Sequence, residues 1–155
     1  MIFLEVPDDF YPKIEVVGCF LEYEDKILLL HRQEHTSQGN LWGIPGGKLE
    51  KSEDPIAGAI RETLEETGFD ISEQRIVDLG KVYIKYPNFD YVYHMVKCKP
   101  HEHPSDVRII FTEHKGFTWV TPEDALKMSL MLDEDECIKL IYGLGKLSYA
   151  ERMNF

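Results

Sequence analysis

Three glutamates within residues 47–69 have the spacing of a carboxylate cluster. Glu62 and Glu66 lie four residues apart with Glu65 beside them, so a helix would hold their like charges on one side, where they repel each other. A hard divalent cation bound by carboxylate oxygens, Mg²⁺ with Mn²⁺ as a possible substitute, would turn that repulsion into ligation. The alternative for such a charge run is a solvated acidic face.

The residues around these glutamates predict a helix over 55–67. Asp54 suits an N-cap, Pro55 suits the first helical position, and Gly68 suits the left-handed residue that ends a helix. At about 100° per residue, the apolar side chains gather on a packing face nearly opposite the glutamates. The residues expected on this packing face are Ile56, Ala59, Ile60, Thr63 and Leu64.

The same stretch matches the Nudix box position by position. That motif is Gly, five residues, Glu, seven residues, Arg-Glu, an apolar residue, any residue, Glu-Glu, any residue, Gly and an apolar residue. The matching residues are Gly47, Glu53, Arg61, Glu62, Glu65, Glu66, Gly68 and Phe69. Thr63 stands where the box prefers an aliphatic residue, although its methyl group still suits packing. The chain therefore resembles the Nudix hydrolases, and the segments LWGIPGGKLE and FTWVTPEDAL are most similar to the MutT-type nucleoside triphosphate pyrophosphohydrolases.

This resemblance implies an α+β fold, an α/β/α sandwich with a mixed central β-sheet, and a single Nudix hydrolase domain over residues 1–155. The implied activity is Mg²⁺-dependent hydrolysis of a phosphoanhydride bond in a nucleoside diphosphate linked to another group. The expected substrate is a nucleoside or deoxynucleoside triphosphate, including oxidised ones, cleaved to the monophosphate and pyrophosphate. A diadenosine polyphosphate, ADP-ribose or nucleotide-sugar hydrolase, a non-catalytic nucleotide sensor and a structural cation-binding protein are the alternatives.

The resemblance also implies roles for individual residues. The metal ligands would be Glu62 and Glu66, then Glu65 and the main-chain carbonyl of Gly46. Pro45 and the two glycines that follow it would let the backbone bend sharply and approach a ligand.

Arg61 would orient Glu53 by a charge-assisted hydrogen bond. The general base stays open between Glu62, Glu65 and Glu113, of which Glu113 is the candidate from the loop that follows the box.

Three further residues are candidates for substrate binding. Arg32 ends an expected central strand, where a guanidinium can clamp a phosphate, although an ordinary surface ion pair is as good an explanation. Lys48 is expected to orient phosphate. Tyr86 lies about seventeen residues after the box, where diadenosine polyphosphate hydrolases tend to carry tyrosine, whereas ADP-ribose enzymes tend to carry proline where this chain has Lys85.

The rest of the chain reads as strands and two further helices. Ile27 to Leu30 form a continuous apolar run, which predicts a strand buried on both faces. Tyrosines in the later strands could partly line a base-binding pocket, although such residues more often belong to the core. The expected strands span 14–23, 26–32, 75–86, 90–99, 107–111 and 117–120, the helices begin at Thr121 and near Asp133, and the tyrosines are Tyr83, Tyr86, Tyr91 and Tyr93.

Composition narrows the class of protein. A length of 155 residues with 43% hydrophobic and 29% charged residues fits one globular domain. A net charge of −11 disfavours binding to nucleic acid, because such proteins concentrate Lys and Arg. We therefore expect a small nucleotide as the partner and metal ions as intermediaries between an acidic enzyme and a polyanion.

The cysteines and the terminal segments concern compartment and assembly. Three cysteines far apart predict no disulfide framework, and an acidic first segment without a long apolar run predicts a cytoplasmic protein that does not enter membranes. A zinc site at Cys98, His101 and His103 is a minor alternative. Residues 1–12 are expected to be a lead-in with a short edge strand, and residues 146–155 a tail or an oligomer contact, so a homodimer is possible.

Overall fold

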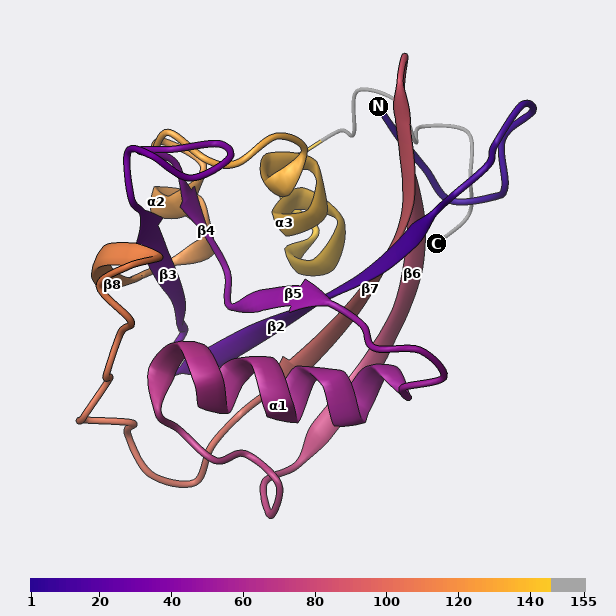
Figure 1. Ribbon diagram of the computed structural model, residues 1–155. Coiled ribbons are helices and arrows are strands. Elements are labelled where there is room, and N and C mark those ends of the chain that lie inside the picture. The colour runs from indigo at the N-terminus through magenta and orange to yellow at the C-terminus, as the bar shows by residue number, and fades with distance from the viewer. Residues whose placement is uncertain (146–155) are drawn as a thin grey trace.

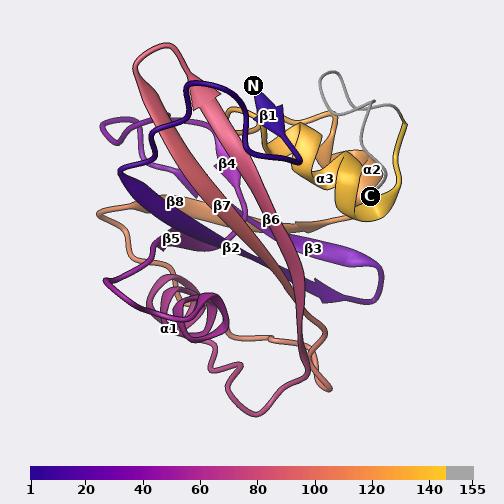
Figure 2. The same ribbon diagram turned by 90° about the vertical axis from the view of Figure 1, so that its right-hand side faces the viewer.

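A mixed β-sheet lies between helices in the computed structural model, which describes residues 1–145 (Figure 1). Helix α1 covers one face of the sheet, and α2 and α3 cover the other (Figure 2). The strands are β1 (Ile2–Phe3), β2 (Ile14–Tyr23), β3 (Lys26–Arg32), β4 (Trp42–Gly43), β5 (Gly46–Lys48), β6 (Ile76–Tyr86), β7 (Phe89–Cys98) and β8 (His114–Val120). The helices are α1 (Pro55–Thr67), α2 (Pro122–Ala125) and α3 (Glu134–Tyr142). The expected α/β/α sandwich is confirmed.

The sheet divides into two branches after the first hairpin. Strands β2 and β3 pair through Glu22 with Ile27 and Tyr23 with Lys26, next to the turn. Farther along, β2 pairs with β5 and, in parallel, with β7, whereas β3 pairs with β4 and β8. The strand order is β1-β6-β7-β2-β3-β4, with β5 on β2 and β8 on β3.

Two apolar layers fill the space between the sheet and its helices. Along β2, Val17, Cys19 and Leu21 face α1, while Phe20 packs in the layer that contains α3. Residues 27–30 of β3 alternate in the same way and are all buried. Period-two alternation thus gives each central strand two covered faces, which confirms the prediction made from the apolar run.

Helix α1 begins and ends as predicted, but it is turned differently about its axis. Asp54 accepts a hydrogen bond from the amide of Ile56, and Gly68 has a φ of 75°. Glu66 is only 6% exposed, however, whereas Leu64 is 46% exposed. The expectation that Leu64 packs inward and all the glutamates point away is therefore wrong. Glu66 can be buried because its carboxylate accepts a hydrogen bond from the Gly46 amide in β5.

The expected strand over 107–111 does not form. The amide of Arg108 donates instead to the carbonyl of Thr67 at 2.7 Å, at the end of α1. Val107 and Ile109 pack into the layer beneath α1, which accounts for their alternating pattern without a ladder partner. The strand predicted at 117–120 begins earlier, at His114.

The remaining elements agree with the sequence. The edge strand β1 pairs with β6, Thr121 caps α2 by accepting from the amide of Asp124, and α3 ends at Tyr142. The three cysteines are free and buried. No helix in the described part of the chain is long and apolar enough to cross a membrane. The expected C-terminal tail or oligomer contact at 146–155 lies outside the described residues.

Candidate functional site

Two glycines of β5 let the backbone come close to the acidic side of α1. The amide of Gly46 donates to Oε1 of Glu66 at 2.8 Å. A Cβ atom on Gly47 would lie 2.6 Å from the carboxyl carbon of Glu62, and one on Gly46 would lie 2.3 Å from the carbonyl oxygen of Val17. Gly46 therefore requires glycine, because a side chain there would meet backbone, whereas a side chain at Gly47 would displace the Glu62 carboxylate. The strand thus fixes where the two carboxylates point.

Arg61 holds two carboxylates with one guanidinium. Its Nε donates to Oε2 of Glu53 and its Nη2 to Oε1, both at 2.8 Å, so the expected charge-assisted hydrogen bond is present and has bidentate geometry. Its Nη1 donates to Oε1 of Glu62 at 2.9 Å, and Nη2 also donates to the carbonyl of Lys48. The hydrogen bonds that Glu53 accepts from Arg61, and one from the amide of Glu50, lower the pKa of Glu53 to about 2, so Glu53 is ionised at neutral pH.

The carboxylates of Glu62 and Glu66 are held together at an electrostatic cost. Burial, together with the neighbouring charges of Glu62 and Glu113, raises the pKa of Glu66 to about 8, although the Gly46 hydrogen bond acts in the opposite direction. Burial also raises the pKa of Glu62. A bound cation would stabilise the ionised forms, so this donor set fits a hard divalent metal ion.

The start of β8 adds two ligand-type side chains to this cluster. Ligand atoms of Glu66, Glu113 and His114 all lie within 4.8 Å of one another. Nε2 of His114 is 3.5 Å from Oε2 of Glu66, and the histidine is only 4% exposed. Burial, followed by the charge of Arg32, lowers the pKa of His114 to about 4, so the imidazole is neutral at pH 7. His114 was not predicted as a site residue, because the sequence indicates a loop at this position.

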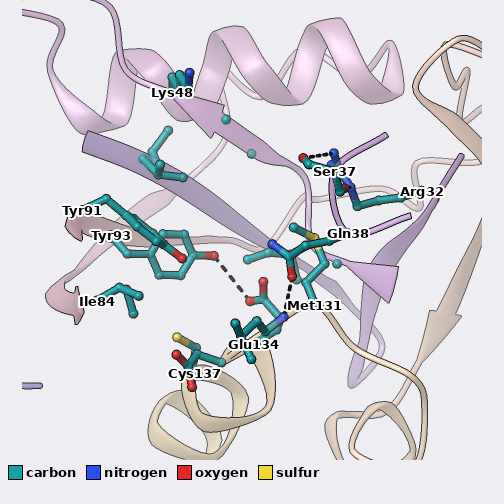
Figure 3. A pocket seen from close by; sticks show the side chains of 18 of the residues that line it. Arg32, Ser37, Gln38, Lys48, Ile84, Tyr91, Tyr93, Met131, Glu134 and Cys137 are labelled. Atoms are coloured by element: carbon teal, nitrogen blue, oxygen red, sulfur yellow. Dashed lines mark hydrogen bonds between the residues drawn. The ribbon is translucent and has the colours of Figure 1, made fainter. Parts of the chain in front are cut away.

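A cavity of about 530 Å³ opens beside the carboxylates and runs between the two branches of the sheet (Figure 3). On the α1 side it is lined by Arg32, Lys48, Glu66 and His114, and on the α3 side by Tyr91, Tyr93, Met131, Glu134 and Cys137. The cavity therefore has one highly charged end and one mainly apolar end.

At the α3 end, one carboxyl group is enclosed by the cavity floor. The hydroxyl of Tyr93 donates to Oε1 of Glu134 at 3.4 Å, and Figure 3 shows the two side chains pointing toward each other. Burial raises the pKa of Glu134 to about 7. A Cβ on Gly18 would lie 2.1 Å from the Tyr93 hydroxyl, so the absence of a side chain there makes room for the ring.

The structure brings most, but not all, of the predicted site residues together. Arg32 lines the cavity, where its Nε donates to the carbonyl of Ser37 at 2.7 Å. Lys48 also lines the cavity, and Glu65 is 54% exposed on α1, with its Oε1 3.6 Å from Nη1 of Arg61. Tyr86 does not line this cavity.

The hydroxyl of Tyr86 instead donates to Oδ2 of Asp133 at 2.6 Å. The tyrosines that line the cavity are Tyr91 and Tyr93, both named from the sequence as pocket candidates. The zinc alternative gains no support, because Cys98 is buried in the layer beneath α1.

Glu134 and Met131 line the cavity but were not predicted from the sequence. They come from the segment before α3 and from its first turn, and no motif near them indicates a ligand. The sequence predicted only that a helix begins near Asp133, and this did not indicate that residues at its start line a cavity.

Comparisons with known proteins agree with this fold and site. The family model described as "NUDIX domain" matches residues 12–141. A CTP pyrophosphohydrolase of Escherichia coli (strain K12) is 31% identical over 124 residues, which cover 76% of this chain and 82% of that protein. A dihydroneopterin triphosphate diphosphatase of Haemophilus influenzae is 30% identical over 134 residues, 80% of this chain and 83% of that protein.

Solved structures show the same fold. The crystal structure of a MutT protein from Methanosarcina mazei Go1 superimposes with a TM-score of 0.70 at 24% identity. The superposition covers 85% of this chain and 94% of that one.

Proposed function

The chain belongs to the NUDIX family, as a MutT-type pyrophosphohydrolase acting on acid anhydrides, and we propose that it cleaves nucleoside or deoxynucleoside triphosphates to the monophosphate and pyrophosphate. The observation that carries the proposal is the buried Glu66 carboxylate at the charged end of a cavity whose other end is apolar and aromatic. One end suits the phosphates and a cation, and the other suits a base.

A divalent cation, Mg²⁺ in our proposal, would be held by Glu62, Glu65, Glu66 and the carbonyl of Gly46. When bound, it would supply neutralisation of phosphate charge and a lowered pKa for a reacting water. The raised pKa values of Glu62 and Glu66 support this assignment, because burial disfavours both ionised carboxylates and a bound cation would offset that cost.

The chain's own residues divide the remaining work. Arg61 is a positioning residue that fixes Glu53 and Glu62 through its forked hydrogen bonds. Arg32 would bind a phosphate oxygen at the cavity wall, with Lys48 at the rim.

The reaction joins a water oxygen to phosphorus and breaks the bridging P–O bond, with pyrophosphate as the leaving group. One carboxylate takes the proton of the water, and Glu62, Glu65 and Glu113 are the candidates. Glu113 lies within 4.8 Å of Glu66 between ligand-type atoms, which brings a base from outside the helix to the carboxylate cluster.

The substrate class rests on the shape of the cavity and on the relatives. Both well-matched relatives are named for triphosphates, CTP and dihydroneopterin triphosphate. Tyr86, the residue that favoured a diadenosine polyphosphate from the sequence, does not line the cavity, and its hydroxyl is engaged with Asp133. A nucleoside triphosphate is therefore our first choice.

Turnover on a nucleotide panel tests this proposal directly. The panel holds the ribo- and deoxynucleoside triphosphates, 8-oxo-dGTP, diadenosine tetraphosphate, ADP-ribose and a nucleotide sugar, each with Mg²⁺ and with Mn²⁺. We expect pyrophosphate, detected after adding inorganic pyrophosphatase, to appear in step with a monophosphate. Glu66→Gln should lower kcat at least about 100-fold, because it removes a charged ligand.

Glu73→Gln is the matched control, because Glu73 is an exposed carboxylate in the loop after α1. Unchanged turnover in Glu66→Gln would remove the metal assignment. Faster turnover of ADP-ribose or a dinucleotide than of every triphosphate would overturn the substrate class, and nucleotide binding without any product would indicate a sensor rather than an enzyme.

A further inference from the structure

His114 is a buried side chain whose ring nitrogens make no hydrogen bond within residues 1–145. Its side chain is 5% exposed, and Nδ1 is buried without a partner. Its other nitrogen, Nε2, faces Oε2 of Glu66 at 3.5 Å, which is longer than a hydrogen bond. A buried polar group in this condition costs free energy, so its retention beside a carboxylate cluster calls for a function.

The spacing of the three side chains resembles that of ligands around one ion. In octahedral coordination with bonds of about 2.1 Å, neighbouring ligand atoms lie about 3.0 Å apart and opposite ones about 4.2 Å apart. The Nε2 to Oε2 distance of 3.5 Å and the outer limit of 4.8 Å for the set that includes Glu113 are only slightly larger. A small inward movement of side chains would bring all three onto one cation.

We propose that His114 gives an imidazole nitrogen to a divalent cation held by Glu66 and Glu113. This inference rests on the proposed function, since it assumes that Glu66 binds metal. It changes the expected donor set from oxygen alone to mixed nitrogen and oxygen. Nitrogen donors favour transition-metal ions over Mg²⁺, so the site should prefer Mn²⁺ to Mg²⁺ by more than an all-oxygen site would.

Structural packing is the competing explanation for a buried histidine. The ordinary structural use of an imidazole is represented by the partly buried His94, whose side chain is 13% exposed and whose Nε2 lies 2.8 Å from Oε1 of Glu15. His114 has no comparable contact, although it lies at the start of β8 next to two carboxylates. The difference favours a ligand that completes its coordination.

Pulsed electron paramagnetic resonance on Mn²⁺-loaded protein tests the inference without any assay of turnover. The wild-type chain is prepared with ¹⁴N-histidine and with ¹⁵N-histidine and loaded with one equivalent of Mn²⁺. We expect the spectrum to show hyperfine coupling between Mn²⁺ and a directly coordinated histidine nitrogen, and this coupling should change when ¹⁵N replaces ¹⁴N. The signal should vanish in His114→Phe, which keeps a ring of similar shape, and persist in His94→Gln.

Titration calorimetry gives a second measure. We expect His114→Phe to weaken Mn²⁺ binding about 10- to 100-fold and Mg²⁺ binding by less than about threefold. Glu66→Gln separates the two levels of the proposal. If Glu66→Gln abolishes Mn²⁺ binding but the wild-type protein shows no histidine nitrogen, the role of His114 is wrong and the proposed function stands.

A histidine signal that survives in His114→Phe would likewise overturn the assignment to His114. If Glu66→Gln leaves Mn²⁺ binding unchanged, the metal site of the proposed function fails as well.

Discussion

The two ends of the cavity are built in different ways. At the α1 end, Gly46 and Glu66 meet across 20 positions of sequence, and Arg61 and Glu53 across eight. At the α3 end, Tyr93 and Glu134 are 41 positions apart. The carboxylates of the charged end thus come mainly from one loop and one helix, to which the distant strands β3 and β8 add Arg32 and His114. The apolar end depends wholly on distant strands packing with α3.

The ends also differ in their electrostatics. Several carboxylates repel one another at the α1 end, and the Arg61 guanidinium compensates only part of the charge. At the α3 end the carboxyls of Asp133 and Glu134 lie among apolar and aromatic groups, Asp133 accepts a hydrogen bond from Tyr86, and burial raises the pKa of Glu134. We infer that the α1 end performs the reaction and that the α3 end selects the nucleotide, so variants at the two ends should change different kinetic constants.

The largest effect should come from Arg61→Lys, which breaks the α1 end. Lysine keeps the charge but loses the fork that holds Glu53 and Glu62. We expect kcat to fall about 100-fold, while KM changes by less than about threefold. Steady-state kinetics check this expectation.

Arg75→Lys makes the same substitution at an exposed position before β6 and serves as the control. Combining Arg61→Lys with Glu53→Gln should add little further loss, since both changes break one pair. A rise in KM without a fall in kcat would mean that Arg61 contacts substrate instead.

A smaller effect, of another kind, should follow Glu134→Gln. Glutamine keeps the size of the side chain but adds donor hydrogens at the α3 end, so it changes which base edges can be satisfied there. We expect the ratio of kcat/KM between the best and second-best triphosphate to shift by about 30-fold. Uniform loss across all nucleotides would contradict the division of labour between the ends.

The stability of the same variant should depend on pH differently from that of the wild type. Burial raises the pKa of Glu134 to about 7, above its ordinary value near 4.5, so the folded state binds the proton more tightly than the unfolded state. This contribution to stability is complete below about pH 4.5 and is lost as the pH rises through 7. We expect Glu134→Gln to remove a decline of roughly 2–3 kcal/mol between pH 5 and 8.

Urea unfolding at four pH values measures that decline. Glu123→Gln, which removes an exposed carboxylate from α2, should keep the wild-type pH dependence. Parallel curves for Glu134→Gln and the wild type would show that Glu134 is ionised in the folded protein at pH 5.

The smallest effect should come from Tyr86→Phe, which removes a hydroxyl outside the cavity. The lost hydrogen bond to Asp133 should lower the free energy of unfolding by about 1 kcal/mol, with KM unchanged within about twofold. Tyr83→Phe removes a hydroxyl from the same strand as a control. A tenfold rise in KM for Tyr86→Phe would restore Tyr86 as a substrate-binding residue.

The features that could be predicted from the sequence are those that depend on contacts between residues close together in the chain. The capped helix, the Glu53–Arg61 pair and the buried run of β3 depend on neighbours in sequence, and all three were predicted correctly. The burial of Glu66 was not, because hydrophobic periodicity assigns a charged residue to solvent and cannot anticipate the amide of Gly46.

The residues brought in from other segments were the hardest to predict. His114 was hidden because alternation at 107–111 reads as a strand, whereas those residues lie across the end of α1. No sequence motif near Glu134 indicates a ligand site, and its place in the cavity depends on its contact with Tyr93 of the distant strand β7.

The bond between the Arg108 amide and the Thr67 carbonyl has a consequence for how this architecture tolerates change. This hydrogen bond joins the backbone five residues before Glu113 to the last turn of α1, next to Glu66. The positions of the two carboxylates are therefore fixed by the same contact. Strands β6 and β7 lie in the chain between Thr67 and Arg108, the two hydrogen-bonded residues. Extra residues at the turn between β6 and β7 would lengthen this connection without changing the spacing of Glu66 and Glu113. We therefore expect this turn to accept an inserted segment.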